Sequence, residues 1–181
     1  MRHLVLSGLA IATVLATPFM IAAPAAAGEA QAAVLGPSGL PLPRFVSLKA
    51  SQANLRIGPG TTYPVDWTYV KRGLPLEIIQ EYDTWRRVRD ADGTEGWVSQ
   101  GLLSGRRTVV AAPWDAGTGA LLDLMAKPGE DASRLARVEP GAMGDVIACG
   151  GQWCHVNFSG TKGWMEQARL WGVYPGEKVE D

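Results

Sequence analysis

The stretch Asn54-Leu55-Arg56-Ile57-Gly58-Pro59-Gly60-Thr61 decides how this chain folds. Its polar–apolar–polar triplet leads into a turn of glycine and proline, which is typical of a short strand that reverses direction. Two further signals follow it in order, Trp85-x-x-Val88 and Gly93-x-x-Gly96-Trp97-Val98. Short apolar or alternating runs divided by turn residues predict strands at 45–49, 54–56, 67–70, 76–81, 85–89 and 95–98. An Asp-Gly pair in the turn 90–93 predicts a hairpin between the last two, with positive φ at its central residues.

A second segment repeats these signals in the same order about 68 residues later. Asn54-Leu55-Arg56 corresponds to Asp123-Leu124-Met125, and Gly96-Trp97-Val98 corresponds to Gly163-Trp164-Met165. A period this long indicates a duplicated small domain rather than a solenoid repeat. Small domains have little core and close their sheet to limit free edges. We therefore expect an all-β protein with two tandem small five-stranded barrels.

The first copy resembles the bacterial SH3-like domain over nearly its whole length, 45–103, through the motifs quoted above and Tyr63-Pro64. The second copy, 120–171, departs from the pattern, because Met125 replaces the arginine and Lys127 stands at the position of Gly58. The resemblance implies a small SH3-like β-barrel, usual in envelope proteins, that binds cell-wall material or peptides.

The N-terminal stretch has the pattern of an export signal. A short basic start is followed by an apolar run from Leu4 to Ala23, and Ala25-Ala26-Ala27 supplies a cleavage site. We expect a cleavable signal peptide at 1–27, a mature protein in the periplasm or secreted, and no membrane span after cleavage. An uncleaved anchor helix is the alternative.

The composition of the remaining chain indicates where the linker and the domains begin and end. Residues 28–43 mix Ala with Gly and Pro without a period, which indicates a flexible linker. The remaining boundaries that we expect are a first barrel at 44–104, a connector at 105–119, a second barrel at 120–174 and a tail at 175–181.

The charge of the chain argues against some partners. A net charge of −1 over 181 residues disfavours a broad nucleic-acid or membrane-surface footprint. The two halves differ, because 44–113 carry 10 Lys+Arg against 7 Asp+Glu and 114–181 carry 6 against 10, which gives +3 and −4. Opposite signs favour docking of the two barrels or a bipolar surface.

The two cysteines, Cys149 and Cys154, fall on Glu81 and Arg86 in the repeat alignment. Both pairs flank the same hairpin, so an opposite-charge pair in the first copy corresponds to two thiols in the second. Cross-strand pairs lie within disulfide range, and an exported protein folds in an oxidising space. We predict a Cys149–Cys154 disulfide, with two free buried thiols as the alternative.

Nothing in the sequence predicts catalysis. His155 adjoins Cys154, but neighbours on a strand point to opposite faces and cannot act as nucleophile and base. These two residues and Cys149 supply too few ligands for zinc, and the acidic segment 90–95 is a hairpin turn rather than a calcium loop. We expect no enzyme, no metal and no cofactor.

Aromatic and basic side chains gather in the first copy. Trp85 follows a hairpin turn and is similar to the tryptophan that lines the peptide groove of eukaryotic SH3 domains. We expect Tyr63 and Trp85 to be partly exposed and to face one groove, where Arg86 or Arg87 bonds a carboxylate-bearing wall peptide. Packing is the alternative for the two aromatic residues, and a solvated strand face for the two arginines. Two tryptophans in Gly-Trp-aliphatic strands are expected in the core, Trp97 and Trp164.

These observations together predict a non-catalytic envelope module that binds the glycan or peptide of peptidoglycan. The alternative is an accessory protein whose barrels hold another envelope protein. A small hydrolase is disfavoured because a nucleophile–base pair is missing from the pattern.

Overall fold

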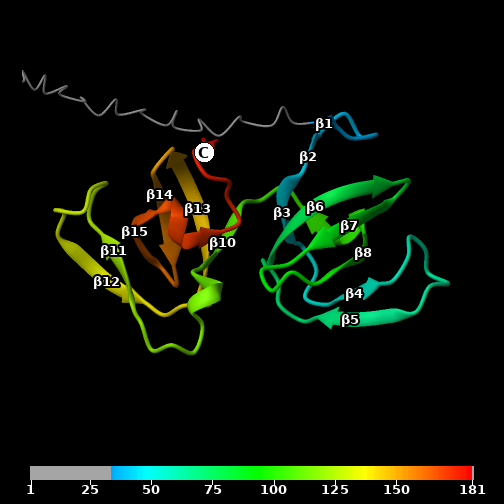
Figure 1. The fold of residues 1–181 in the computed structure, drawn as a ribbon, viewed down its shortest axis with the longest axis horizontal. Coiled ribbons are helices and arrows are strands. Elements are labelled where there is room, and N and C mark those ends of the chain that lie inside the picture. The colour runs from blue at the N-terminus through cyan, green and yellow to red at the C-terminus, as the bar shows by residue number, and fades with distance from the viewer. Residues whose placement is uncertain (1–33, 181) are drawn as a thin grey trace, which may run out of the picture. The chain divides into compact units, whose positions relative to one another are not determined.

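Two curled antiparallel sheets and one small two-stranded sheet make up the computed structural model, which describes residues 34–180 (Figure 1). The predicted signal peptide and the residues up to 33 lie outside this range. The described helical segments are three short 3-10 turns, η1 (Gln100–Leu102), η2 (Pro113–Asp115) and η3 (Gln167–Arg169). Within 34–180, none of the helices has the length and apolar character needed to cross a membrane. The all-β prediction is confirmed.

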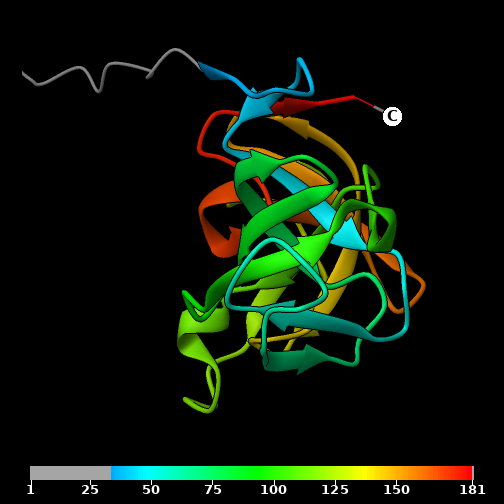
Figure 2. The ribbon, with the colours of Figure 1, turned by 90° about the vertical axis from the view of Figure 1, so that its right-hand side faces the viewer.

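The first barrel contains all six strands predicted from the sequence, with ends that shift by one or two residues, and a short closing strand. Its sheet order is β5-β4-β8-β7-β6-β3-β9, which leaves β5 at one edge (Figure 2 turns this barrel toward the viewer). The strands are β3 (Arg44–Leu48), β4 (Ala53–Arg56), β5 (Val65–Tyr69), β6 (Pro75–Tyr82), β7 (Trp85–Arg89), β8 (Glu95–Ser99) and β9 (Leu103–Ser104).

The second barrel repeats this topology, in the order β12-β11-β15-β14-β13-β10-β16, with β17 added to β13. Each sheet therefore has more short strands than the five that we expected. The strands are β10 (Thr108–Ala111), β11 (Leu122–Met125), β12 (Arg134–Val138), β13 (Met143–Gly150), β14 (Trp153–Phe158), β15 (Thr161–Glu166), β16 (Leu170–Trp171) and β17 (Lys178–Val179).

Two of the predicted boundaries need correction. The expected connector, 105–119, contains β10, which pairs with β13 and β16 and is the first strand of the second barrel. The expected tail, 175–181, contains β17, which pairs with Cys149 and Gly150 of β13. Sequence reasoning missed both strands, since each is short and gains its hydrogen bonds from strands distant in the chain.

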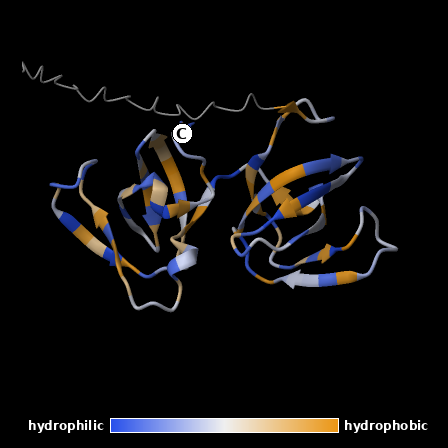
Figure 3. Cartoon of the chain, in the orientation of Figure 1, coloured by the Kyte–Doolittle hydropathy of each residue, from blue (hydrophilic) through white to orange (hydrophobic). Residues whose placement is uncertain are grey.

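Side chains alternate between the two faces of each strand, and the apolar ones that face inward form the core of each barrel. Figure 3 shows this as alternating colours along the strands. Leu55 and Val98 are fully buried in the first barrel. The prediction that Trp97 and Trp164 are core residues is wrong, because both are only half-buried. Their neighbours Val98 and Met165 point inward, so the tryptophans take the outer face of the strand.

The glycine before each of these tryptophans has a packing role. A Cβ on Gly96 would lie 2.5 Å from Cγ of Leu55, and a Cβ on Gly163 would lie 2.6 Å from Cγ of Leu124. Real Cβ atoms do not approach carbon so closely, so only glycine lets these leucines fill the two cores.

The hairpin turn at 90–93 forms where it was predicted, with one difference in conformation. Gly93 alone among its residues adopts a positive φ, of 84°. The Oδ1 atom of Asp90 accepts hydrogen bonds from the backbone amides of Asp92, at 3.1 Å, and Thr94, at 2.9 Å. The acidic segment therefore acts as a turn, and its first carboxylate stabilises it.

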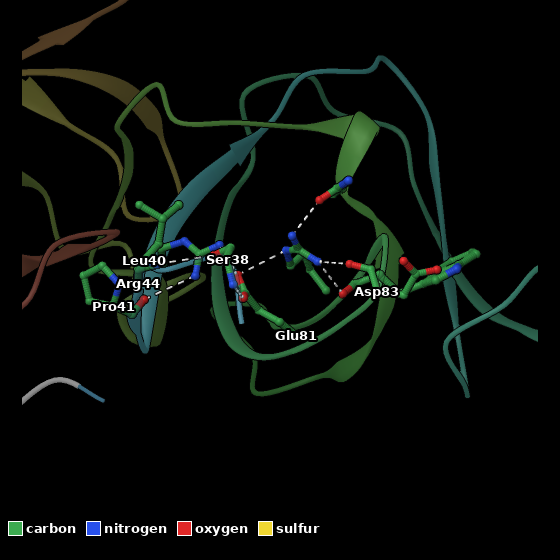
Figure 4. A network of polar contacts seen from close by, with 9 residues as sticks. Ser38, Leu40, Pro41, Arg44, Glu81 and Asp83 are labelled. Carbon is green, nitrogen blue, oxygen red and sulfur yellow. Dashed lines mark hydrogen bonds and ion pairs between the residues drawn. The ribbon is translucent and has the colours of Figure 1, made fainter. Parts of the chain in front are cut away.

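Residues 34–43 are not the flexible tether that we expected over 28–43. They form a small hairpin of β1 (Val34–Leu35) and β2 (Pro41–Leu42). Glu81 holds this segment, because its carboxylate accepts bonds from the amide and hydroxyl of Ser38, both at 2.8 Å, and from Arg44 at 2.6 Å (Figure 4). These bonds outweigh the effect of burial, which alone would raise the pKa of Glu81, and lower it to about 2.

The two barrels contact one another within the unit that spans 32–181. The ring of Phe45 lies 5.1 Å from that of Trp171 and 4.7 Å from that of Tyr174. The Tyr174 hydroxyl donates to Oε1 of Glu77 at 2.9 Å, and Arg89 donates to the other oxygen of that carboxylate at 2.6 Å. The contact includes aromatic rings and a carboxylate that Tyr174 and Arg89 share.

Candidate functional site

A groove of about 420 Å³ in the first barrel is the candidate ligand site. Its walls come from β4, from the turn after β4, from the start of β7 and from the end of β8 with η1. The lining residues are Gln52, Ala53, Asn54, Arg56, Thr61, Trp85, Ser99 and Leu102. One tryptophan face, one cation and several hydrogen-bonding groups therefore surround a hollow that could hold a sugar ring or an amino-acid residue.

Strand β4 positions the polar wall of this groove. Ala53 and Leu55 are buried, so the alternating residues Asn54 and Arg56 turn outward toward the groove. The guanidinium of Arg56 donates to the carbonyl oxygen of Tyr63 at 2.6 Å, which fixes the turn that carries Thr61. Arg56 forms no ion pair with any residue in the described part of the chain, so its charge is available to a ligand.

Trp85 is positioned by the tight turn between β6 and β7. Asp83 has a positive φ of 47° there, and the amide of Gln100 donates to the carbonyl oxygen of Thr84 at 2.9 Å. Trp85 opens β7 directly across from Ser99 and is half-buried, with part of its indole facing the groove.

Tyr63 has a different setting from Trp85. The residue is 45% exposed. Its ring covers the preceding turn, because a Cβ on Gly58 would lie only 2.4 Å from Cδ1 of Tyr63. Thr61 of the same turn lines the groove with Trp85, whereas Tyr63 is not among the lining residues. That Tyr63 and Trp85 act on one ligand stays a prediction.

The two arginines beside Trp85 lie on opposite faces of β7. Arg86 is buried and bonded, with its Nε 3.3 Å from Oε1 of Glu81 and its Nη2 2.6 Å from Oε1 of Gln100. Arg87 faces outward and pairs with Glu95 at 2.9 Å. Because the guanidinium of Arg86 is occupied inside the barrel, we leave it out of the ligand set proposed below. Arg87 remains partly exposed.

Sequence reasoning missed most of the residues that line the groove, including Asn54, Arg56, Thr61 and Ser99. A signal for two of them was present in the quoted motif. Once Leu55 is placed in the core, strand alternation puts Asn54 and Arg56 on the outer face. The same alternation counted back from Val88 places Arg86 inside.

Cys154 and His155 are separated in the way that the strand period predicts. Cys154 is buried and bonded to Cys149, which confirms the predicted disulfide. His155 lies on the other face, where its ring stacks on Trp164 at 5.0 Å. The thiol of Cys154 is thus bonded to sulfur, and the imidazole packs against an indole.

The comparison with protein families agrees with this duplicated fold. The model of the bacterial SH3 domain matches two segments, residues 49–105 and 120–172. These segments cover most of both barrels and omit the first strand of each, β3 and β10.

Known relatives share part of this chain. A Bacillus subtilis (strain 168) protein, YrvJ, is named for an N-acetylmuramoyl-L-alanine amidase. It is 26% identical over an alignment of 137 residues, which covers 68% of this chain and 26% of that protein. The chain therefore spans about a quarter of the length of this relative.

Solved structures with some similarity include NlpC2 of Trichomonas vaginalis, with a TM-score of 0.32, 10% identity, and coverage of 71% of this chain and 48% of that one. An NlpC/P60 family protein of Bacillus cereus ATCC 10987 has a TM-score of 0.31 at 12% identity, with coverage of 72% and 57%. TM-scores this low do not establish a shared arrangement of the whole chains.

Proposed function

Because the chain belongs to the bacterial SH3 domain family, we propose that it is a non-catalytic module of the bacterial envelope that binds a cell-wall glycan or peptide. The relative named for an N-acetylmuramoyl-L-alanine amidase supports this setting, since an enzyme of that name acts on the cell wall. The sulfur–sulfur bond of Cys154 supports a binding role rather than thiol chemistry.

The observation that carries the proposal is the groove of the first barrel. Trp85 offers an indole face on which a sugar ring or a peptide plane can stack. Arg56 offers a cation without an acidic partner in the described chain, which suits the carboxylates of wall peptides. Asn54, Thr61 and Ser99 add side-chain hydrogen-bonding groups around them. Arg87 lies on the same face of β7 as Trp85 and could extend this contact.

Sedimentation with purified insoluble murein tests the proposal. We expect Trp85→Ala to weaken binding by about 2 kcal/mol or more, roughly 30-fold, as truncation of an interface anchor does. Trp67→Ala is the matched control, since Trp67 lies in the same barrel, is 58% exposed and does not line the groove.

Two results would contradict this proposal. One is murein binding that survives Trp85→Ala in a protein with an unchanged circular dichroism spectrum. The other is equal loss in Trp85→Ala and Trp67→Ala, which would indicate a general effect on the barrel.

A second candidate function, that of an accessory protein holding another envelope protein, is favoured by the edge strand β5. Val65 and Trp67 are 44% and 58% exposed on this strand, and Ile57 nearby is 61% exposed. An edge strand with apolar side chains can accept a further strand from a partner. Here Trp67→Ala should abolish co-purification of one stoichiometric protein and leave murein binding unchanged.

We also propose export to the periplasm or the exterior through the signal peptide at 1–27. The apolar run and the Ala25-Ala26-Ala27 site support it, as does the membership in a bacterial SH3 family. N-terminal sequencing of the protein from its native host should begin at Gly28. A soluble cytoplasmic protein that retains Met1 would contradict export.

A further inference from the structure

The second barrel has a groove of about 300 Å³ at the same place in its fold as the groove of the first. Trp153 opens β14 as Trp85 opens β7, and each tryptophan lines the groove of its own barrel. In the strand ladder Trp153 lies across from Glu166, whereas Trp85 lies across from Ser99. The two grooves are therefore duplicated versions of one site, and equivalent positions can be compared directly.

Carboxylates replace hydroxyl groups between the two grooves. Glu166 of the second groove stands at the position of Ser99 in the first. Glu130 follows a Pro-Gly pair, as Thr61 does, and both line their grooves. Two neutral donors of the first groove thus become two negative charges in the second.

The cation of the first groove is lost as well. Met125 stands where the first groove has Arg56, since each pairs with the tryptophan of its own Gly-Trp strand. Met125 is buried, at 8% exposed, and lines the second groove beside the half-buried Trp153. The second groove therefore has an apolar surface where the first is basic.

Other charges near the second groove are neutralised within the barrel. Asp123 pairs with Arg134 at 3.3 Å and with Arg137 at 3.7 Å. Arg169 pairs with Asp115 at 2.5 Å. The two glutamates, by contrast, have no ion-pair partner anywhere in the region 34–180. They leave the groove with two uncompensated negative charges.

This arrangement matches a ligand with an aliphatic stem and a positive end. The stem can pack on Trp153 and Met125, while an ammonium group forms charge-assisted bonds with Glu130 or Glu166. Glu130 and Glu166 would repel a carboxylate in the same place, and Arg169, which also lines the groove, is already paired with Asp115. We propose that the groove of the second barrel binds a peptide with a lysine-type side chain, a primary ammonium on an aliphatic stem.

This inference goes beyond the proposed function and does not depend on it. The first groove suits a carboxylate, and the second suits an amine, so the two copies take ligands of opposite charge. The second groove can bind an amine even if the first barrel binds no cell-wall material.

A pair of synthetic peptides tests the inference with the full mature chain. The probe is acetyl-Gly-Lys-Gly-amide, and its control is the same peptide with an acetylated lysine amine, which keeps the stem and removes the charge. Heteronuclear NMR titration follows the indole N–H signals of Trp153 and Trp85. We expect the free amine to shift the Trp153 signal and to bind about tenfold more tightly than the acetylated peptide.

Two variants test whether the preference for the free amine comes from the second groove. The double variant Glu130→Gln/Glu166→Gln preserves side-chain shape and should lose the preference for the free amine. Glu139→Gln is the matched control, since Glu139 is an exposed carboxylate of the same barrel that does not line the groove. Higher salt should weaken binding of the free amine alone.

Four results would overturn the inference. They are equal binding of the two peptides, an unchanged preference in the double variant, shifts confined to Trp85, and the absence of any shift at millimolar peptide. Sedimentation with murein is a separate readout, so failure here and failure of the proposed function remain distinguishable.

Discussion

Glu81 and Arg86 face one another across the β6–β7 hairpin, 3.3 Å apart, at the register position where the second barrel has the bond between Cys149 and Cys154. The residues of the ion pair and of the disulfide also contact a segment outside their hairpin. Glu81 accepts bonds from Ser38 and Arg44 of the N-terminal hairpin segment, and Cys149 pairs with β17 near the C-terminus. The duplicated position therefore closes a hairpin in each copy and anchors a segment outside it, the one before β3 in the first barrel and β17 in the second.

Reduction of the Cys149–Cys154 bond should destabilise the second barrel by about 2 kcal/mol, because the bond closes only a small loop and removes little entropy from the unfolded chain. Urea unfolding with and without reductant measures this. Hydrogen exchange should show lower protection in β14 and little change in β7. Mass spectrometry after alkylation of the denatured, unreduced protein should show no adduct, and two adducts would contradict the bond.

The Glu81 network should make stability depend on acid pH. The folded pKa of Glu81 is lowered to about 2 from 4.5, so its stabilisation is complete above about pH 4.5 and is lost as the pH falls toward 2. At neutral pH we expect Glu81→Gln to lower the free energy of unfolding by about 3 kcal/mol, because the buried Arg86 and the partly buried Arg44 lose their partner. The difference from wild type should shrink between pH 4.5 and 2 in urea titrations.

Glu95→Gln is the control for that experiment. Glu95 pairs with Arg87 on the surface, where both side chains are about a third or more exposed. Its loss should cost less than about 1 kcal/mol. A cost for Glu81→Gln that stays constant down to pH 2 would contradict the predicted linkage.

Two tyrosines should resist ionisation in the folded protein. Burial is the main cause that raises the pKa of Tyr69, and the adjacent carboxylate of Asp90 raises it further. Burial is also the main cause for Tyr174, and Glu77 adds to it. Their hydroxyls therefore stabilise the fold fully below pH 10, and this contribution falls at higher pH. In an alkaline titration, Tyr69→Phe and Tyr174→Phe should each keep the phenolate absorbance change that wild type shows before unfolding. A variant that loses part of this change would disprove the shift at its residue.

Because Leu55 lies in the core of the first barrel and Trp97 does not, truncating each to alanine should change the free energy of unfolding by different amounts. Leu55 is fully buried against Gly96, so Leu55→Ala should lower the free energy of unfolding by about 2–5 kcal/mol. Trp97 is half-buried on the outer face, and Trp97→Ala should cost about 1 kcal/mol. Urea unfolding of both variants checks the order, and a larger loss for Trp97→Ala would return that residue to the core.

The sequence by itself determined the six main strands of the first barrel, the duplication and the disulfide. These features depend on local signals: turn residues end strands, alternation marks their faces, and one hairpin sets the register between Cys149 and Cys154. The family motif lies in the same local segments, which is why the fold of both copies could be predicted.

Only the tertiary structure decided which faces and which distant segments meet. Ser38 and Glu81 are 43 residues apart, and neither residue alone predicts that the N-terminal hairpin docks on β6. Arg86 is inside because Glu81 and Gln100 satisfy its guanidinium, whereas Arg56 faces the groove because Leu55 fills the core. A charged side chain enters a barrel only with partners brought there by the folded chain, so the composition of the groove had to come from the fold.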